Sequence, residues 1–408
     1  MNALVTLAVF ALGSIQPAKA TDVAPPLQEY LVDAGHSIIE FSIGFAFSRV
    51  KGRFTDAKGT ILYDAARPAN SSVTIVINAK SIDTGWPHRD EHLRTSDFFD
   101  VEKYPRIVFQ STRVRESGNG WIAEGPLTMH GVTRPVSIPF HLLRAPVRST
   151  ESNWMMMDVA GALRLARADF GIFGGSTFNS WFNKARAATM SDSVDIDLEI
   201  EGYSADAESQ QSPGIVGALE RIRTGGVEAQ ISRLVDLKKQ KTPAEFDAYV
   251  FGGELLVSAL VAQKRVDDAV KLSRALTEMW PTYHGAHLLH GFALTVAGDK
   301  RGASAQFAKG KEVFKPPVRD PNEKFPQVDD NWYYLDQIAR TAVELGNASA
   351  AVPLAKTITE IYPTTARAHT TYGIALAARG DSTGAAAAYA NALRVDPDET
   401  RAMEWSRR

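Results

Sequence analysis

The stretch SVDIDLEIEGY, residues 193–203, alternates apolar and acidic side chains one by one. Successive side chains of a β-strand point to opposite faces of the sheet, so one face of this segment is hydrocarbon and the other is charged. The apolar face consists of Val194, Ile196, Leu198 and Ile200. This pattern predicts an antiparallel strand with one face toward a core and one toward water.

Seven further segments between residues 30 and 203 show strand-like patterns of the same kind, so we expect about eight strands. They are IIEFSIGF (38–45), GTILYD (59–64), SVTIVIN (72–78), RIVFQSTRV (106–114), NGWIAEGPLT (119–128), RPVSIPFHLL (134–143) and WMMMDVAGALRL (154–165). Inward positions in two of them are Val73, Ile75, Ile77, Val136, Ile138, Phe140 and Leu142. One-sided antiparallel strands in this number suit a closed barrel or a sandwich. A barrel of eight strands is just wide enough to hold one small ligand.

The second half of the chain has a helical period and repeats itself. A polar stretch with short amphipathic helices, residues 204–243, predicts a linker. Beyond residue 244, four blocks of about 34 residues match the tetratricopeptide spacing. The blocks are 250–283, 284–317, 332–365 and 366–399. Such all-α arrays ordinarily present a surface to a protein or peptide partner.

Composition narrows the functional classes. The chain has 408 residues, a formal net charge of −2 at pH 7 and no cysteine. This charge gives no electrostatic case for binding nucleic acid or an anionic membrane, and the lack of cysteine excludes disulfides and thiolate chemistry. Residues 1–20 carry an apolar run followed by AKA, which predicts a secretory signal peptide and a periplasmic or secreted protein. No later apolar run approaches the roughly 18 residues of a membrane helix.

The stretch HRDEH, residues 88–92, matches the H-x-x-E-H pattern of inverted zincins. His88 and His92 would then bind zinc, and Glu91 would polarise a bound water. Pro87 leaves room for only a short helix, and no helical glutamate downstream offers a third ligand before the linker. We therefore expect no metal site and no catalytic residue, with a zinc-dependent hydrolase kept as an alternative.

Together with the segments around it, this region resembles the YceI-like family of secreted lipid-binding barrels. The matching stretches are SIDTGWPHRDEHLRTSDFFDVEKYPRIVF (81–109), LTMHGVTRPVSI (127–138), GHSIIEFSI (35–43), VKGRFTDAKGTI (50–61) and ARADFGI (166–172). The recurrent run of that family, arginine-aspartate-x-histidine-leucine, is met by Arg89, Asp90, His92 and Leu93. His88 is not part of it, so the zincin pattern arises from one additional histidine.

The resemblance implies a lipocalin-like barrel over residues 28–203 whose lumen holds an isoprenoid chain of the quinone or polyprenyl type. That lipid is the expected ligand, and no other cofactor is expected. The apolar inward faces point the same way, because such a lumen needs no catalytic group. Candidate lipid-binding residues are Phe41, Ile43, Phe45, Arg53, Ile75, Ile77, His92, Phe109, Trp121, His130, Ile138, Phe140, Phe178 and Trp181.

Several of these candidates have a structural alternative. His92 and Asp90 fit a polar network that fixes the short helix to the barrel, and His130 fits a tight turn before Gly131. Arg53 fits an ion pair with Asp56 or Glu91 as well as a ligand head group. In residues 170–190, Phe173, Phe178, Trp181 and Phe182 would either form a lid hinged at Gly174-Gly175 or pack as a surface loop. A scaffold without lipid remains a further alternative for the whole protein.

Overall fold

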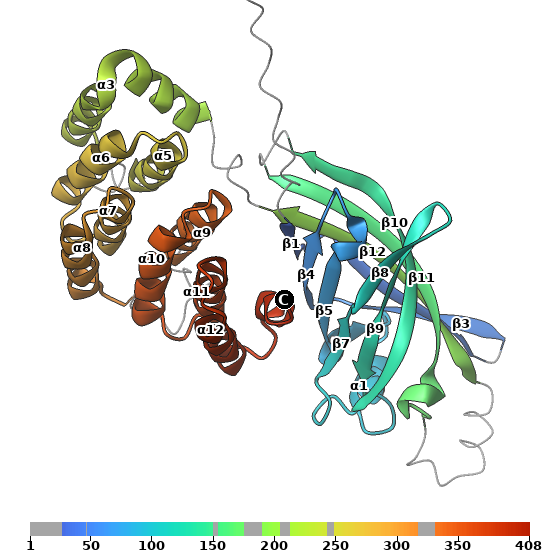
Figure 1. The fold of residues 1–408 in the computed structure, drawn as a ribbon. Coiled ribbons are helices and arrows are strands. Elements are labelled where there is room, and N and C mark those ends of the chain that lie inside the picture. The colour runs from blue at the N-terminus through green and yellow to red at the C-terminus, as the bar shows by residue number, and fades with distance from the viewer. Residues whose placement is uncertain are drawn as a thin grey trace, which may run out of the picture.

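The computed structural model describes residues 27–45, 47–149, 154–174, 190–204, 213–242, 249–316 and 331–408. Within these residues a β-barrel in the first half of the chain is followed by an array of helices in the second half (Figure 1). The signal-peptide prediction for residues 1–20 and most of the 170–190 segment lie outside the described residues.

Eight antiparallel strands close the barrel, as the sequence predicted. In ring order they are β1 (Gln28–Val32), β4 (Ala57–Tyr63), β5 (Ser72–Asn78), β7 (Arg106–Gln110), β9 (Gly120–Met129), β10 (Val132–Arg148), β11 (Met155–Ala166) and β12 (Met190–Ser204). The ring closes where Leu31 and Val32 pair with Tyr203 and Gly202. Closure leaves no free edge on the ring, so the barrel does not expose a template for strand addition there.

Further elements extend the wall beyond the ring. Strands β2 (Ile38–Phe45), β3 (Ser48–Phe54) and β6 (Ile82–Asp83) continue the sheet from β12, and β8 (Arg113–Ser117) pairs with β9. Helix α1 (Pro87–Arg94) follows β6, and three 3₁₀ turns lie at η1 (Pro68–Asn70), η2 (Ala79–Ser81) and η3 (Arg167–Phe170). The stretch 106–114 was predicted as one strand, but it is divided between β7 and β8. It turns at Ser111 and Thr112, whose N–H groups donate to Val73 and Glu124 on two different strands.

The turn between β9 and β10 shows how local chemistry sets the register. His130 and Gly131 both have positive φ, 52° and 74°, and they join Met129 directly to its partner Val132. Two central residues with positive φ define the hairpin turn whose twist matches the flanking strands. A Cβ atom on Gly131 would lie 2.4 Å from the Tyr104 ring, so only glycine fits there.

The helical array begins with α3 (Pro213–Gln240), which breaks at Gly226, where φ is 77°. Four helical hairpins follow: α5 (Tyr249–Ala262) with α6 (Val266–Met279), α7 (His284–Val296) with α8 (Lys300–Val313), α9 (Asn331–Glu344) with α10 (Ala348–Ile361), and α11 (Ala366–Ala378) with α12 (Ser382–Val395). Glycine lets paired helices approach closely, because a Cβ atom on Gly373 would lie 2.4 Å from Tyr389. A short last helix, α13 (Thr400–Trp405), leaves the array and reaches the barrel.

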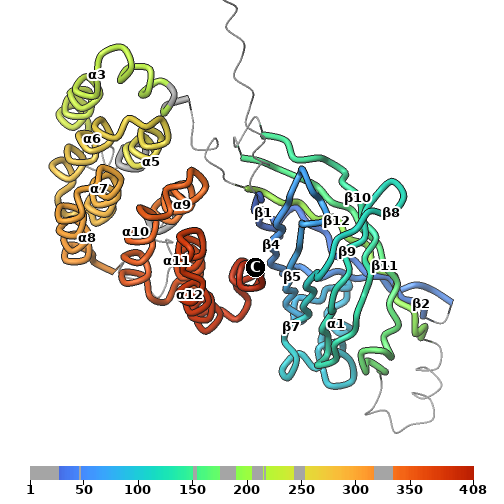
Figure 2. The backbone as a smooth tube through the Cα atoms, viewed as in Figure 1, coloured from blue at the N-terminus to red at the C-terminus, as the bar shows by residue number. Residues whose placement is uncertain are grey.

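Helix α13 covers the outer faces of β4 and β5, and the C-terminus lies beside these strands (Figure 2). Thr400 and Thr60 share a 2.7 Å hydrogen bond, and Glu404 accepts hydrogen bonds from Ser72 (2.6 Å) and Thr74 (2.5 Å). These groups are buried or nearly so, which makes the hydrogen bonds structurally important. The helical array is therefore attached to the barrel wall through the end of the chain.

A buried ionic cluster completes this interface. Glu29 on β1 accepts hydrogen bonds from Arg401 and Trp405 of the last helix, both at 2.7 Å, and lies 3.1 Å from Arg340 on α9. Burial opposes the charge on Glu29, but Arg340, Arg401 and the Trp405 indole outweigh it and lower the pKa of this carboxyl to about 2. The barrel therefore contributes a charged carboxylate to a site made by the array. The alternation that revealed the strands contained no signal for this contact.

Candidate functional site: an apolar lumen open at one end

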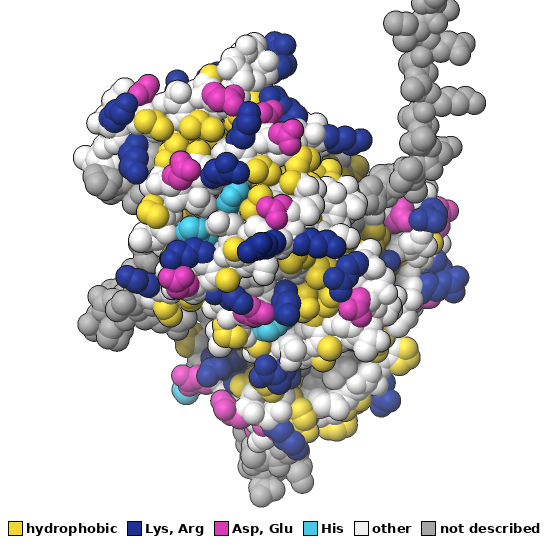
Figure 3. Space-filling view, turned by 60° about the vertical axis from the view of Figure 1, so that its left-hand side comes forward, with side chains coloured by type: hydrophobic (Ala, Val, Ile, Leu, Met, Phe, Trp, Pro, Cys, Tyr) yellow, Lys and Arg dark blue, Asp and Glu magenta, His cyan; other side chains and the backbone are white. Residues whose placement is uncertain are grey.

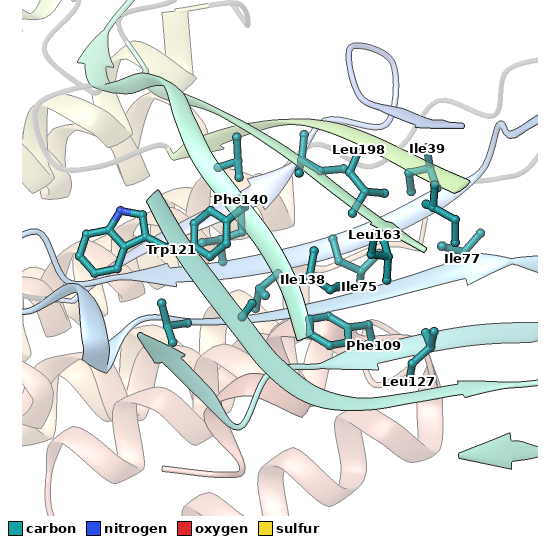
Figure 4. Close-up of a pocket in the computed structure, with 18 of the residues that line it drawn as sticks. Ile39, Ile75, Ile77, Phe109, Trp121, Leu127, Ile138, Phe140, Leu163 and Leu198 are labelled. Carbon is teal, nitrogen blue, oxygen red and sulfur yellow. The ribbon is translucent and has the colours of Figure 1, made fainter. Parts of the chain in front are cut away.

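A cavity of about 200 Å³ lies inside the barrel (Figure 4). Hydrocarbon side chains from every strand of the ring other than β1 line it. Its wall includes Ile61, Ile75, Ile77, Phe109, Trp121, Leu127, Ile138, Phe140, Leu163 and Leu198. In Figure 4 the labelled side chains come from strands around the barrel and point into a shared interior. A dry cavity of this kind is suited to an apolar ligand and offers almost no partner for water.

The alternation of β5 and β12 produces this wall. Val73, Ile75 and Ile77 line the cavity, whereas Thr74 and Val76 between them are buried on the outer side. On β12, the inward positions from 196 to 200 line the same cavity, and Asp195 pairs outside with Arg49 (2.5 Å) and Arg164 (2.5 Å). The two Arg side chains lower the pKa of Asp195, chiefly through their hydrogen bonds. On β12, charge thus stays outside the barrel and hydrocarbon inside.

A second cavity of about 490 Å³ continues the first toward helix α1. Phe41, Phe54, Met129, Leu165 and Ile196 line both cavities, so the two spaces adjoin. The outer cavity adds polar groups to an apolar wall, namely Ser48, His88, Arg89, His92 and Arg167. The arrangement is an apolar interior with a few polar side chains at one end, which is typical of sites for amphipathic ligands.

Helix α1 is held at this end by its own polar side chains. His92 Nε2 lies 3.0 Å from Asp97 Oδ2, and the His92 ring packs edge-on against Phe98 at 5.1 Å. Buried Asp90 accepts hydrogen bonds from the Thr84 backbone N–H (2.9 Å) and hydroxyl (2.5 Å). Asp90 therefore fixes the start of the helix to the preceding loop. His92 both joins such a network and lines the outer cavity, so the two predicted roles for it are compatible.

The geometry gives no support to zinc binding at HRDEH. His88 Nδ1 lies 3.8 Å from Glu91 Oε2 on an exposed helical turn, while His92 turns to Asp97. Across the residues that the structure describes, Asp33, His36 and Glu201 are the one set of three side chains close enough to share an ion. His36 is exposed there and hydrogen-bonds to Asp33 (2.9 Å), which raises the pKa of His36, so this set is an ordinary surface ion pair.

Most of the predicted lipid-binding residues lie on the two cavities. The inner one is lined by Phe41, Ile75, Ile77, Phe109, Trp121, Ile138 and Phe140, and the outer one by Phe41, Ile43, Phe45 and His92. Two candidates lie elsewhere. Arg53 faces outward and pairs with Asp83 at 3.5 Å rather than with Asp56 or Glu91. His130 occupies the β9–β10 turn, where its Nδ1 is 3.1 Å from the Phe170 carbonyl oxygen. Phe178, Trp181 and Phe182 lie outside the described residues, and Phe173 is exposed.

Several lumen residues were not singled out from the sequence. Strand β11 contributes Met157, Val159, Leu163 and Leu165, which are the odd positions of a segment predicted as a strand. Their period-two spacing was a usable signal, although Gly161 and two adjacent methionines make it less regular. Trp86 also lines the outer cavity, but its place before Pro87 carries no strand pattern.

The fold and the cavity define a class: a closed antiparallel barrel around an apolar cavity. The family model of the YceI-like domain matches residues 30–202. A UPF0312 protein of Shewanella baltica is 32% identical over 186 residues, which are 44% of this chain and 90% of that protein. A UPF0312 protein of Vibrio cholerae is 34% identical over 182 residues, which are 43% of this chain and 86% of that one. The chain belongs to the YceI-like family through its first half.

Solved structures with a similar barrel share less sequence. BcnA of Burkholderia cenocepacia has 22% identity and a TM-score of 0.36, covering 42% of this chain and 98% of that one. A structure described as a polyisoprenoid binding domain from Saccharophagus degradans has 19% identity and a TM-score of 0.34, covering 44% and 99%. Within the described part of the chain, none of the helices combines the length and the apolarity needed to cross a bilayer.

Proposed function

We propose that the protein is a periplasmic or secreted carrier that holds a long-chain isoprenoid lipid, of the quinone or polyprenyl type, in the barrel lumen. The observation that supports this most directly is the apolar inner cavity continued by a wider outer cavity with polar groups at its end. A hydrocarbon tail would occupy the first and a polar head the second.

Burial of hydrocarbon supplies enough free energy for such binding. Each CH₂ group removed from water contributes about 0.8 kcal/mol, so a long chain gains on the order of tens of kcal/mol before costs. Non-covalent affinities saturate near roughly 18–21 kcal/mol, because ordering the chain and partial burial consume the rest. The lumen therefore needs no catalytic group and no metal to hold its ligand, and polar side chains at the mouth have only to orient the head.

Two neighbouring residues of β10 provide a matched test. Leu142 lines the lumen, whereas Leu143 is exposed on the outside of the same strand. Native mass spectrometry should find a co-purifying lipid with the natural protein and with Leu143→Asp, but not with Leu142→Asp, because a carboxylate in the lumen is costly to bury. Circular dichroism shows whether both variants fold, and Ile138→Trp, which fills the lumen without adding charge, serves as the second lumen variant. A natural protein that neither carries nor takes up isoprenoid lipids would overturn the proposal.

We also propose that the helical array is of the tetratricopeptide kind and docks a protein partner. The hairpins follow one another with the predicted blocks, and glycine positions 291 and 373 pack against Phe307 and Tyr389 of the second helix, as this repeat requires. Figure 3 shows hydrophobic side chains gathered among Lys and Arg side chains on the face that the array turns forward. Tyr283 and His287 form hydrogen bonds within the array: Tyr283 donates to Glu254, and His287 contacts Gln306 and the Pro281 carbonyl oxygen.

The array proposal has a positional test. Arg340 of α9 already serves the interface with the barrel, and so does Arg401. Cross-linking in the host cell envelope followed by mass spectrometry should therefore place partner contacts on α3 to α8. Partner cross-links confined to the barrel would contradict a docking role for the array.

A further inference from the structure

Three exposed aromatic side chains lie around the open end of the lumen. Phe47 is fully exposed, Phe173 is 66% exposed and Trp86 is 54% exposed. The other large hydrophobic side chains exposed in the described residues are aliphatic and lie elsewhere: Ile38, Leu143, Val147, Val235 and Leu345. Exposed aromatic side chains are thus concentrated at one place, which is where a functional surface is expected.

Trp86 borders the outer cavity directly, and Phe47 and Phe173 border it through neighbouring residues. Phe47 lies in the turn between β2 and β3, beside Phe45 and Ser48, which line that cavity. Trp86 lines it directly, and Phe173 lies between Ile172 and Gly174, which do so too. In Figure 1 strand β3 lies at the right of the barrel and helix α1 at its lower end, with the helical array on the left. The array therefore leaves this rim open.

The rim is held in place and carries positive charge. The Arg89 guanidinium lies 5.5 Å from the Trp86 ring and donates to the Thr84 hydroxyl (2.7 Å) and carbonyl (2.9 Å). Arg167 donates to the backbone carbonyls of Ser191 (2.9 Å), Ile172 (2.8 Å) and Phe173. Among the ion pairs formed by described residues, neither arginine has a carboxylate partner, and nearby Glu91 lies against His88 instead. Lys51 on β3 is exposed as well.

We propose that this aromatic rim (Phe47, Trp86 and Phe173) docks the barrel mouth onto an anionic lipid bilayer, from which the ligand passes directly into the lumen. This inference rests on the proposed function, because a water-insoluble isoprenoid resides in a membrane. Trp and Phe side chains partition into the bilayer interface, and arginine and lysine beside them attract anionic head groups. The near-neutral charge of the whole chain does not oppose this, since the attraction acts locally within about 10 Å at moderate salt. A lipid entering through such a rim never exposes its chain to water.

Vesicle co-flotation tests the docking step separately from ligand binding. The main variant is Phe47→Ser/Phe173→Ser, because neither side chain lines either cavity. Against vesicles of phosphatidylglycerol and phosphatidylethanolamine, we expect the natural protein to bind and the double variant to bind at least about tenfold more weakly, since it loses two interfacial aromatics. Leu143→Ser/Val147→Ser removes two exposed apolar side chains away from the mouth and should bind as the natural protein does. Equal binding by both double variants, or no binding by the natural protein, would overturn the proposal.

Two further comparisons distinguish a failure of membrane docking from a failure of lipid binding in the lumen. Ile138→Trp, with its lumen filled, should still bind vesicles while it no longer takes up lipid; vesicle binding that vanishes with the filled lumen would show that the rim itself does not dock. The Phe47→Ser/Phe173→Ser protein should take up isoprenoid delivered in detergent but extract it from vesicles more slowly. Equal binding to phosphatidylcholine vesicles would overturn the assignment to an anionic surface, and cross-linking of both rim positions to a soluble protein without vesicle binding would favour a protein partner instead.

Discussion

Strand β5 carries Val73, Ile75 and Ile77 into the lumen on one face, and on the other it carries Ser72 and Thr74 to the carboxylate of Glu404. The inner surface is hydrocarbon and leaves a cavity, whereas the outer surface is polar and closely paired. A hydrocarbon wall tolerates a change of shape, because its attraction is not directional. A buried network of charges and hydrogen bonds does not tolerate the loss of one member, because its partners remain buried without compensation.

The largest effect is expected from Glu29→Gln, which removes the carboxylate that the buried Arg401 and Arg340 guanidinium groups share. Removing one partner of a buried pair costs about 3–5 kcal/mol, so denaturant titration should show a loss of that order at pH 7. Leu163→Met in the lumen wall should cost less than about 1.5 kcal/mol. Glu199→Gln, at an exposed position, is the control. If Glu29→Gln lowers the free energy of unfolding no more than this control does, the distinction between the inner and outer surfaces of the barrel wall is contradicted.

The same carboxyl gives the interface a defined response to acid. The pKa of Glu29 is about 2 in the folded protein, below its ordinary value of 4.5. The unfolded chain therefore takes up a proton first, and stability present above pH 4.5 is lost as the pH falls from about 4.5 toward 2. The difference in unfolding free energy between the natural protein and Glu29→Gln should shrink over this interval. A difference that stays constant down to pH 2.5 would show that Glu29 is not held in its charged form.

The array contains a buried glutamate, Glu254, whose pKa is shifted in the opposite direction to that of Glu29. Burial raises the pKa of Glu254 to about 8, while a hydrogen bond from Tyr283 acts against the increase. The folded protein keeps this proton where the unfolded chain has released it, so stability falls as the pH rises from about 4.5 to about 8. Glu254→Gln should remove this slope and stabilise the array at pH 7 by on the order of 2 kcal/mol. Hydrogen exchange of α5 at pH 5 and pH 8 measures this, with exposed Glu278→Gln as the control.

A smaller pair of effects compares the two faces of one strand. Thr74→Val removes the hydroxyl that donates to Glu404, which should cost about 1–3 kcal/mol. Ile75→Val, one residue along and facing the lumen, should cost about 0.5–1.5 kcal/mol. Lipid binding measured by native mass spectrometry should respond to the second change and not to the first. A loss of bound lipid on Thr74→Val alone would contradict a strict separation of the faces.

The smallest effect is expected at the solvent-exposed edge of the interface between the helical array and the barrel. Lys58 pairs with Asp396 at 3.2 Å and Arg106 pairs with Asp398 at 2.8 Å, and these side chains are partly or largely exposed. Water and salt weaken such pairs, so Lys58→Met/Arg106→Met should change the unfolding free energy by no more than about 0.5 kcal/mol. Thermal unfolding at low and high salt checks this. A large loss would mean that the attachment of the array depends on surface charge rather than on Glu29 and Glu404.

The difference between the inner and outer surfaces of the barrel wall also explains which features could be predicted from the sequence. The barrel and its inward positions follow from period-two alternation, because a wall between water and hydrocarbon requires a local pattern at each residue. Residues such as Ile138 and Phe140 were therefore predicted, and Leu163 could have been. The contacts of Glu29 with Arg401 and Arg340 join positions hundreds of residues apart, and single charged residues have no period. The outward turn of Arg53 depended likewise on Asp83, a partner that no local pattern identifies.

The barrel wall between the lumen and the last helix is one strand thick. Ile75 contacts whatever fills the interior, and the adjacent Thr74 holds Glu404 of α13. The free volume behind Ile75 lets the lumen side chains adjust to a tail, so the hydrogen bond on the far side of the strand keeps its length. The attachment of the helices therefore stays the same whether the barrel is empty or loaded.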